Sequence, residues 1–256
     1  MTDLRYTAEH VLAVKQWVPG KLFSIRTTRS PEFRFKPGQF ARLGLPALGS
    51  EGVPTIWRGF SMVNESSADY LEFYAVVVPD GEFSPQLAQL QPGDSLYVDK
   101  TAFGFLTLDN FSNGGDSLWL LATGTGLSAY LSLLLEEKTW TLFNKVVLCH
   151  GVRYADELNY QEQIQACQAQ WGERFVYLPL PTREAYQDYP QARLTELIEK
   201  NQLAELAKIP LDPEKACIML CGNPDMLTDA SKILGERGFA TGRRGNIGNL
   251  AVEKYW

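Results

Sequence analysis

Hydrophobic residues follow two different patterns along this chain. Before residue 110, apolar and polar positions alternate in short runs such as "FARLGL" (40–45), "LEFYAVVV" (71–78) and "SLYVD" (95–99), separated by the turn sequences "KPGQ", "VPDG" and "QPGD". Alternation with a period of two is typical of strands with one buried face. We therefore expect an antiparallel β-barrel in the N-terminal part.

After Leu118, short continuous apolar runs alternate with stretches of helical periodicity. Continuous runs are typical of strands buried on both faces of a parallel sheet, and their alternation with helices indicates a doubly wound α/β domain. The predicted strands are "LWLLA", "KVVLCH", "RFVYLPL" and "ACIMLCG", and the predicted helices include "ELNYQEQIQACQAQW", "ARLTELIEKNQL" and "PDMLTDASKILGERG". A polar, glycine-rich stretch at 109–117 separates the two patterns, so we expect one domain over residues 1–112 and another over residues 113–256.

The uncharged stretch "LWLLATGTGLSAYLSLLL", residues 118–135, raises the question of a membrane span. A span needs roughly 20 apolar residues in a row, whereas "TGTG" and Ser128 interrupt this stretch at its centre. A buried strand, a glycine loop and a helix explain it better. Glycines let a phosphate approach the backbone and a helix start offers unpaired N–H groups, so the stretch predicts nucleotide binding. A tight connection without a ligand is the alternative.

The end of the next predicted strand bears on the kind of nucleotide. Val152 and Arg153 stand there, without the acidic residue that usually binds the ribose 2'-hydroxyl of NAD. Arg183 and Arg193 also fall at or shortly after strand ends. Guanidinium groups suit a phosphate monoester, so the pattern favours NADP(H) over NAD(H).

The N-terminal part contains a second candidate anion site. In "WRGFSMVN", a strand places the side chains of Arg58 and Phe60 on one face and that of Ser61 on the other. In "PDGEFSPQLAQL", Ser84 is a good N-cap and Pro85 a good first helical residue, which predicts a phosphate site at a helix start. An ordinary strand end is the alternative for the first of these stretches.

Composition narrows the class of protein. The net charge of −6 argues against nucleic-acid binding and against binding to anionic membranes. The 4 cysteines lack paired zinc spacings and there are only 2 histidines, so no metal site is expected. The first 20 residues contain acidic side chains and no continuous apolar core, unlike a secretory signal. We expect a reduced, cytoplasmic protein without membrane insertion.

Four ordered motifs carry a family resemblance. "RGFS" resembles the R-x-Y-S flavin motif of the ferredoxin–NADP reductase family, "GEFS" its second FAD motif, "ATGTG" its NADP loop and "CGNPDM" its C-G-x-x-x-M signature. The similarity extends from "FKPGQFARL" to the terminal "EKYW" and is strongest to bacterial ferredoxin (flavodoxin)–NADP reductases. It implies an FAD-binding barrel, an NADP-binding α/β domain, and ferredoxin or flavodoxin as partner.

The resemblance also implies roles for individual residues. Arg58 would hold the FAD pyrophosphate, Phe60 would pack on the flavin, and Ser61 would hydrogen-bond near flavin N5. Phe60 departs from the tyrosine of the family, which keeps the stacking face but removes a hydroxyl. Cys221 would position the nicotinamide, with a small core residue as the alternative, so Ser61 and Cys221 are the candidate catalytic residues.

Other residues match the family's cofactor contacts. Those toward FAD are Gly59, Tyr74, Ala75, Val76, Val77, Glu82, Phe83 and Ser84, with Tyr255 and Trp256 covering another part of FAD unless they form an exposed tail. Those toward NADP are Thr125, Val152, Arg153, Thr182, Arg183, Arg193, Asn223, Pro224 and Asp225.

The function implied is hydride transfer from NADPH to FAD, followed by single-electron transfer to ferredoxin or flavodoxin, in a monomeric enzyme. One alternative is an NADPH-dependent reductase for a quinone, free flavin or an oxygenase partner, and another is a nucleotide-sensing module without electron transfer. Acidic partners would dock on basic side chains near the flavin. The candidates are Arg26, Arg29, Arg34, Lys36, Arg237, Arg243 and Arg244.

Overall fold

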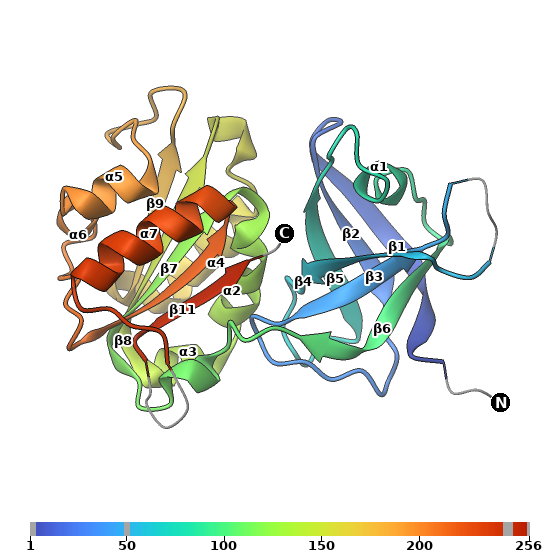
Figure 1. The fold of residues 1–256 in the computed structure, drawn as a ribbon, viewed down its shortest axis with the longest axis horizontal. Helices are drawn as coiled ribbons and strands as arrows, with labels where there is room; N and C mark the ends of the chain where they lie inside the picture. Colours follow the sequence, from blue (N-terminus) through green and yellow to red (C-terminus); the bar gives the residue numbers. More distant parts are fainter. Residues whose placement is uncertain (1–3, 49–51, 243–247, 255–256) are drawn as a thin grey trace.

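A computed structural model describes residues 4–48, 52–242 and 248–254 of the chain, which form an antiparallel barrel beside a parallel sheet covered by helices (Figure 1). The fold predicted from the two hydrophobic patterns is confirmed. The two parts lie side by side, and the sites described below occur where they meet.

Six antiparallel strands form the barrel, in the order β4-β3-β6-β1-β2-β5. A bridge between Met62 and Phe73 links the two edge strands. The inward-facing side chains, among them Phe23, Ile25 and Leu43, are fully buried. The strand bounds are β1 Tyr6–Val18, β2 Leu22–Thr28, β3 Phe40–Leu45, β4 Ile56–Ser61, β5 Tyr70–Val76 and β6 Ser95–Phe103; the one-turn helix α1, Ser84–Leu87, follows β5.

Five parallel strands form the second sheet, in the order β11-β10-β7-β8-β9. Helices cover both faces, because successive side chains of each buried strand point to opposite sides. The strands are β7 Gly115–Thr123, β8 Phe143–Val152, β9 Phe175–Pro181, β10 Ala216–Gly222 and β11 Leu250–Lys254. The helices are α2 Leu127–Leu134, α3 Glu137–Leu142, α4 Gln161–Trp171, α5 Leu194–Glu199, α6 Gln202–Ala207 and α7 Pro224–Glu236.

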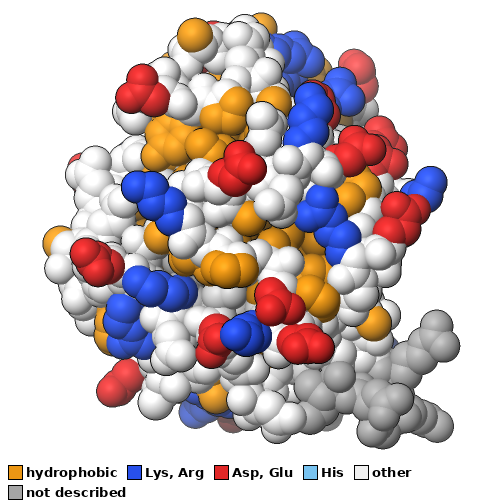
Figure 2. All heavy atoms as spheres, turned by 90° about the vertical axis from the view of Figure 1, so that its left-hand side faces the viewer, with side chains coloured by type: hydrophobic (Ala, Val, Ile, Leu, Met, Phe, Trp, Pro, Cys, Tyr) orange, Lys and Arg blue, Asp and Glu red, His pale blue; other side chains and the backbone are white. Residues whose placement is uncertain are grey.

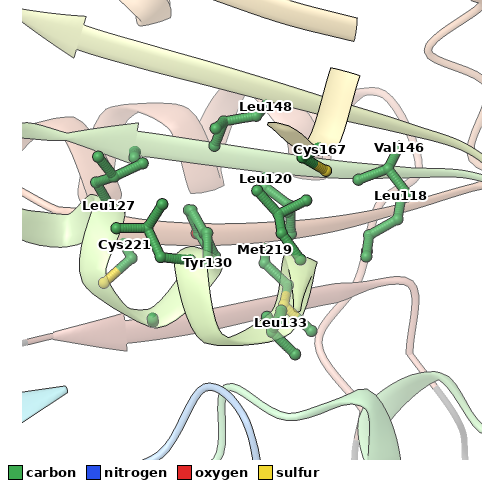
Figure 3. Packing of buried hydrophobic residues seen from close by; sticks show 14 of the residues in the cluster. Leu118, Leu120, Leu127, Tyr130, Leu133, Val146, Leu148, Cys167, Met219 and Cys221 are labelled. Atoms are coloured by element: carbon green, nitrogen blue, oxygen red, sulfur yellow. The ribbon is translucent and has the colours of Figure 1, made fainter. Parts of the chain in front are cut away.

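Each face of this sheet has its own core. Val146 and Leu148 of β8 pack with α2 and α4, in the cluster seen in Figure 3, whereas Val147 and Cys149 pack with α5, α6 and α7. The first cluster also contains Leu22 and Tyr74 of the barrel. A few barrel side chains therefore pack into the core on this face of the sheet, while the interior of the barrel forms a cluster of its own.

Several predicted elements differ from the structure. The helix expected over "ARLTELIEKNQL" is divided into α5 and α6 at Asn201, which has a left-handed φ of 59°. The helix expected from Glu157 begins only at Gln161, after a left-handed Tyr160. Strand β11, parallel to β10, was not predicted. Among the described residues no helix is long and apolar enough to cross a membrane.

Candidate functional site

A pocket of about 280 Å³ opens on the barrel beside the end of β4. We call it the barrel pocket. It gathers β4, β5 and the start of α1 on one side and the glycine loop of the parallel sheet on the other. Its lining residues are Arg58, Gly59, Phe60, Ser61, Tyr74, Ala75, Val76, Val78, Gly81, Glu82, Phe83, Ser84, Thr125 and Ser128.

The strand geometry predicted for β4 matches the burial of its side chains. Arg58 is exposed, with Nη1 donating to the Trp57 carbonyl at 2.8 Å, while Ser61 on the opposite face is buried. Phe60 is half-buried, with its ring 5.7 Å from that of Phe83. Gly59 lies against Phe40, where a Cβ would be 3.0 Å from the ring. The pocket wall is thus aromatic and apolar with a guanidinium at its edge.

The helix start in this pocket differs from the prediction. Phe83, not Ser84, is the N-cap of α1, and no side chain caps the helix. The Ser84 hydroxyl instead accepts a hydrogen bond from the Val78 N–H at 2.8 Å, which closes the loop between β5 and α1. Because α1 is only 4 residues long, its dipole adds little to an anion site here.

A second, larger pocket of about 550 Å³ lies at the carboxyl ends of the parallel strands. We call it the sheet pocket. Such a location is the usual ligand site of open α/β sheets. Its lining residues are Leu22, Val76, Thr123, Gly124, Thr125, Gly151, Val152, Arg153, Glu157, Thr182, Arg183, Arg193, Leu194, Thr195, Asn223, Asp225, Met226 and Asp229.

The glycine loop of the sheet pocket is tightly fitted against the neighbouring strand. A Cβ on Gly126 would lie 2.5 Å from the carbonyl oxygen of Cys221, a distance that no side chain accepts. Thr123 Oγ1 accepts from the Asn223 N–H at 2.8 Å, so the ends of β7 and β10 are joined directly. Asn223 also caps α7 by accepting from the Asp225 and Met226 N–H groups.

The three arginines of the sheet pocket are exposed at its rim. Arg153 is held by Glu157, whose carboxylate accepts from the Arg153 backbone N–H at 3.1 Å and pairs with its Nε at 3.3 Å. Glu157 is 5% exposed and also pairs with Lys21 of the barrel. Burial raises the pKa of Glu157, but Lys21 and Arg153 outweigh it, so the pKa lies below its ordinary value.

The two pockets share Val76 and Thr125 in their walls. Hydrogen bonds across the interface fix this junction: Asn159 Nδ2 donates to the Tyr74 hydroxyl at 2.7 Å, and the Tyr160 hydroxyl donates to Glu72 at 2.9 Å. Ligands in the two pockets would therefore meet at one point in the interface.

A few predicted residues lie elsewhere. Val77 packs against the barrel core and Pro224 begins α7, and neither lines a pocket. Cys221 is fully buried in the core cluster of Figure 3, and its carbonyl oxygen lies against Gly126 of the glycine loop. Its positioning role stays a prediction. Tyr255 and Trp256 lie outside the described residues.

The candidate docking cations that the structure describes already have partners. Arg26 pairs with Glu72, and Lys36 pairs with Asp109. Arg29, Arg34 and Arg237 donate to backbone carbonyls, and Arg243 and Arg244 lie outside the described residues. On the outer face of the parallel-sheet part, acidic and basic side chains are interspersed (Figure 2). That face therefore offers no broad field of one sign.

Two buried carboxylates of the parallel-sheet part were missed by the sequence reasoning. Glu157 stands four residues after Arg153, the spacing of a local ion pair, and this signal was available. Glu253 of β11 accepts from the Phe105 and Leu106 N–H groups at 3.0 and 3.3 Å. Burial raises the pKa of Glu253. No local sequence pattern predicts the burial of Glu253, because its partners are far away in the sequence.

The barrel pocket adjoins a pocket at the carboxyl ends of a doubly wound sheet, with Arg58 at one and three arginines at the other. This arrangement is that of a two-domain protein that binds nucleotides. A family model described as an oxidoreductase NAD-binding domain matches residues 120–232.

Known proteins resemble the whole chain. Ferredoxin–NADP reductase A of Sorangium cellulosum is 38% identical over 97% of this chain and 90% of the relative, and the flavodoxin/ferredoxin–NADP reductase of Escherichia coli K12 is 36% identical over 96% and 97%. The crystal structure of a ferredoxin NADP+ reductase from Neisseria gonorrhoeae with bound FAD and NADP superimposes with a TM-score of 0.91, at 34% identity, covering 99% of this chain and 100% of that one. The chain belongs to the ferredoxin–NADP reductase family, as its motifs predicted, and is an oxidoreductase.

Proposed function

We propose that this protein binds FAD in the barrel pocket and NADPH in the sheet pocket, and passes electrons from NADPH to ferredoxin or flavodoxin. The observation that carries the proposal is the shared wall of the two pockets at Val76 and Thr125. Hydride transfer requires direct contact between donor and acceptor rings, and two adjoining pockets provide it.

The residues of the barrel pocket fit a flavin nucleotide. Phe60, Tyr74 and Val76 offer an apolar wall for a planar ring system, and Arg58 offers a guanidinium for a pyrophosphate. Gly59 lines the pocket and is exposed, so a ligand can approach its backbone. FAD, when bound, accepts a hydride and releases electrons singly, which is the chemistry that joins NADPH to a one-electron carrier.

The residues of the sheet pocket fit a nucleotide with an extra phosphate. Arg153, Arg183 and Arg193 would hold the 2'-phosphate, and the loop at Gly124 and Thr125 would receive the pyrophosphate. Glu157 keeps Arg153 at the rim before a ligand arrives. The chain's own part is therefore to bind, orient and exclude water at the shared wall.

An anaerobic titration of the purified holoprotein tests the proposal. We expect NADPH to bleach the visible flavin spectrum rapidly and NADH to do so much more slowly. The double variant Arg153→Gln/Arg183→Gln should slow bleaching by NADPH at least about tenfold and leave NADH unchanged. Lys232→Gln, an exposed change on α7 outside both pockets, is the charge control. A protein that takes up no FAD, or a flavin that neither nucleotide reduces, would contradict the proposal.

The electron acceptor is proposed from the relatives, whose names include ferredoxin and flavodoxin. Purified ferredoxin and flavodoxin should each be reduced by NADPH in the presence of the enzyme faster than a quinone at the same concentration. Faster quinone reduction would favour the alternative acceptor. The four buried free cysteines are compatible with a cytoplasmic protein, and we propose a monomer, which light scattering would test.

A further inference from the structure

His150 lies in β8 directly beneath the glycine loop and is fully buried. Its neighbours in the sheet are Ala122 of β7 and Pro179 of β9. His150 Nε2 is 3.0 Å from the carbonyl oxygen of Gly124. A carbonyl oxygen only accepts, so Nε2 carries the proton and donates.

The other ring nitrogen of His150, Nδ1, gains no hydrogen bond from its burial. Among the described residues no hydrogen-bond partner exists for Nδ1, although it is buried. Burial lowers the pKa of His150 to about 4, so the ring is neutral at physiological pH. A buried polar atom without a partner is unfavourable, and an apolar side chain would avoid it. The hydrogen bond to the Gly124 carbonyl is therefore the one hydrogen bond of this ring within the described part of the chain, and an apolar side chain at position 150 could not make it.

The bond fixes the orientation of one peptide group. Gly124 begins the loop with a left-handed φ of 53°, and its carbonyl also accepts from the Leu127 N–H. In a planar trans peptide the carbonyl of Gly124 and the N–H of Thr125 point in opposite directions. Holding the carbonyl inward toward His150 therefore turns the Thr125 N–H away from the core. Thr125 lines both pockets.

We infer that His150 is a positioning residue of the sheet pocket, which presents the Thr125 N–H to the pyrophosphate of the nicotinamide nucleotide by holding the Gly124 carbonyl. The inference rests on the proposed function, since it requires a dinucleotide in this pocket. His150 touches neither ligand, and its effect reaches them through the 124–125 peptide. This positioning role is separate from hydride transfer, in which His150 takes no part.

Two nucleotides separate this role from a purely structural one. NADP+ carries both the pyrophosphate and the 2'-phosphate, whereas 2'-AMP carries only the phosphate that the arginines would hold. We expect His150→Leu holoenzyme to bind NADP+ about tenfold more weakly, as one hydrogen bond accounts for, and 2'-AMP with unchanged affinity. His150→Gln, whose amide N–H reaches as far as Nε2, should restore most NADP+ binding. KM for NADPH should change with kcat nearly constant.

Calorimetric titrations of both nucleotides, with thermal unfolding of each variant, decide the matter. If His150→Leu is insoluble, His150→Asn replaces it, because its shorter amide does not reach Gly124. Unchanged NADP+ affinity, equal losses for both nucleotides, or a His150→Gln variant as weak as His150→Leu would each overturn the inference. A wild-type protein that binds neither nucleotide would instead contradict the proposed function, and the inference would fall with it.

Discussion

The barrel pocket and the sheet pocket differ in charge and in how they are built. The barrel pocket has one cation and one anion, Arg58 and Glu82, in a wall of aromatic and small residues. The sheet pocket has three arginines and three carboxylates, Glu157, Asp225 and Asp229. Apolar walls retain a ligand through its buried area, while exposed charges bind in a way that solvent and salt readily reverse. The first arrangement suits a resident cofactor, and the second suits a substrate that must leave.

The pockets also differ in the length of chain they draw on. Apart from Thr125 and Ser128, residues 58–84 supply the whole barrel pocket, whereas the sheet pocket, apart from Leu22 and Val76, collects strand ends between residues 123 and 229. The sheet pocket therefore depends on long-range fit, and the barrel pocket on local strand geometry. Variants that damage one pocket and spare the other test this contrast.

The largest effect is expected from Gly126→Ala. The new Cβ would meet the Cys221 carbonyl at 2.5 Å, so the glycine loop must move away from β10. Binding of NADP+ should weaken by more than about 100-fold, because misplacing a binding loop disturbs every contact it makes. Flavin content, measured as the ratio of visible to ultraviolet absorbance, should fall far less, because residues 58–84 supply all of the barrel pocket except Thr125 and Ser128.

The control for this variant is Gly235→Ala, on the exposed surface of α7, where a Cβ meets no atom within 4 Å. It should bind both nucleotides normally. If Gly126→Ala bound NADP+ as well as Gly235→Ala does, the loop would not need its close fit against Cys221, and the long-range account of the sheet pocket would fail.

A smaller loss, in the barrel pocket and not in the sheet pocket, is expected from Arg58→Ala. Its guanidinium is the only cation in the barrel-pocket wall among the described residues, so FAD affinity should fall about 10- to 100-fold, the range for a charged hydrogen bond. FAD release during gel filtration measures this change, and NADP+ binding should persist. Arg42→Ala, an exposed arginine of β3 outside the pocket, should retain FAD. Equal loss of FAD from both variants would indicate damage to the barrel.

The same contrast explains what the sequence predicts and what it does not. The barrel-pocket residues Arg58, Phe60 and Ser84 lie close together in the sequence, so motifs place them without knowledge of the fold. The strand ends at Thr125 and Arg153 were also predictable, because carboxyl ends of parallel strands meet at one edge. Their order in the sheet was not, and neither was the parallel strand β11.

Three features of the structure were not specified by the local sequence pattern. Ser84 was expected to cap a helix, but its hydroxyl bonds to Val78 across a loop whose shape the sequence does not specify. Asn201 divides α5 from α6 by adopting a left-handed conformation that helical periodicity does not register. Glu253 and its partners, Phe105 and Leu106, are brought together only by the completed fold. Only the contacts of Glu253 are long-range; Ser84 and Asn201 depart from expectation through a loop bond and a backbone conformation that the local pattern does not encode.

The smallest effects concern two buried carboxylates, which should respond to pH in opposite ways. The net lowering of the pKa of Glu157, from its ordinary value of 4.5, means that its contribution to stability is present above that pH and is lost as pH falls through the lowered pKa. Burial raises the pKa of Glu253 despite the two N–H groups that it accepts from, so its contribution is present below pH 4.5 and is lost as pH rises through the raised pKa.

Urea unfolding of the holoprotein between about pH 3.5 and pH 8 measures both. The stability of the wild type relative to Glu157→Gln should be greatest at neutral pH and shrink in acid, because the ion pairs with Lys21 and Arg153 disappear. The stability relative to Glu253→Gln should instead shrink as pH rises, because a charge then forms in a buried site with only backbone donors. Glu236→Gln, at the exposed end of α7, gives the baseline. Glu157 differs from Glu253 chiefly in having cations beside it. If the stability differences of the two variants from the wild type changed with pH in the same direction, the neighbours of these carboxylates would not set their charge.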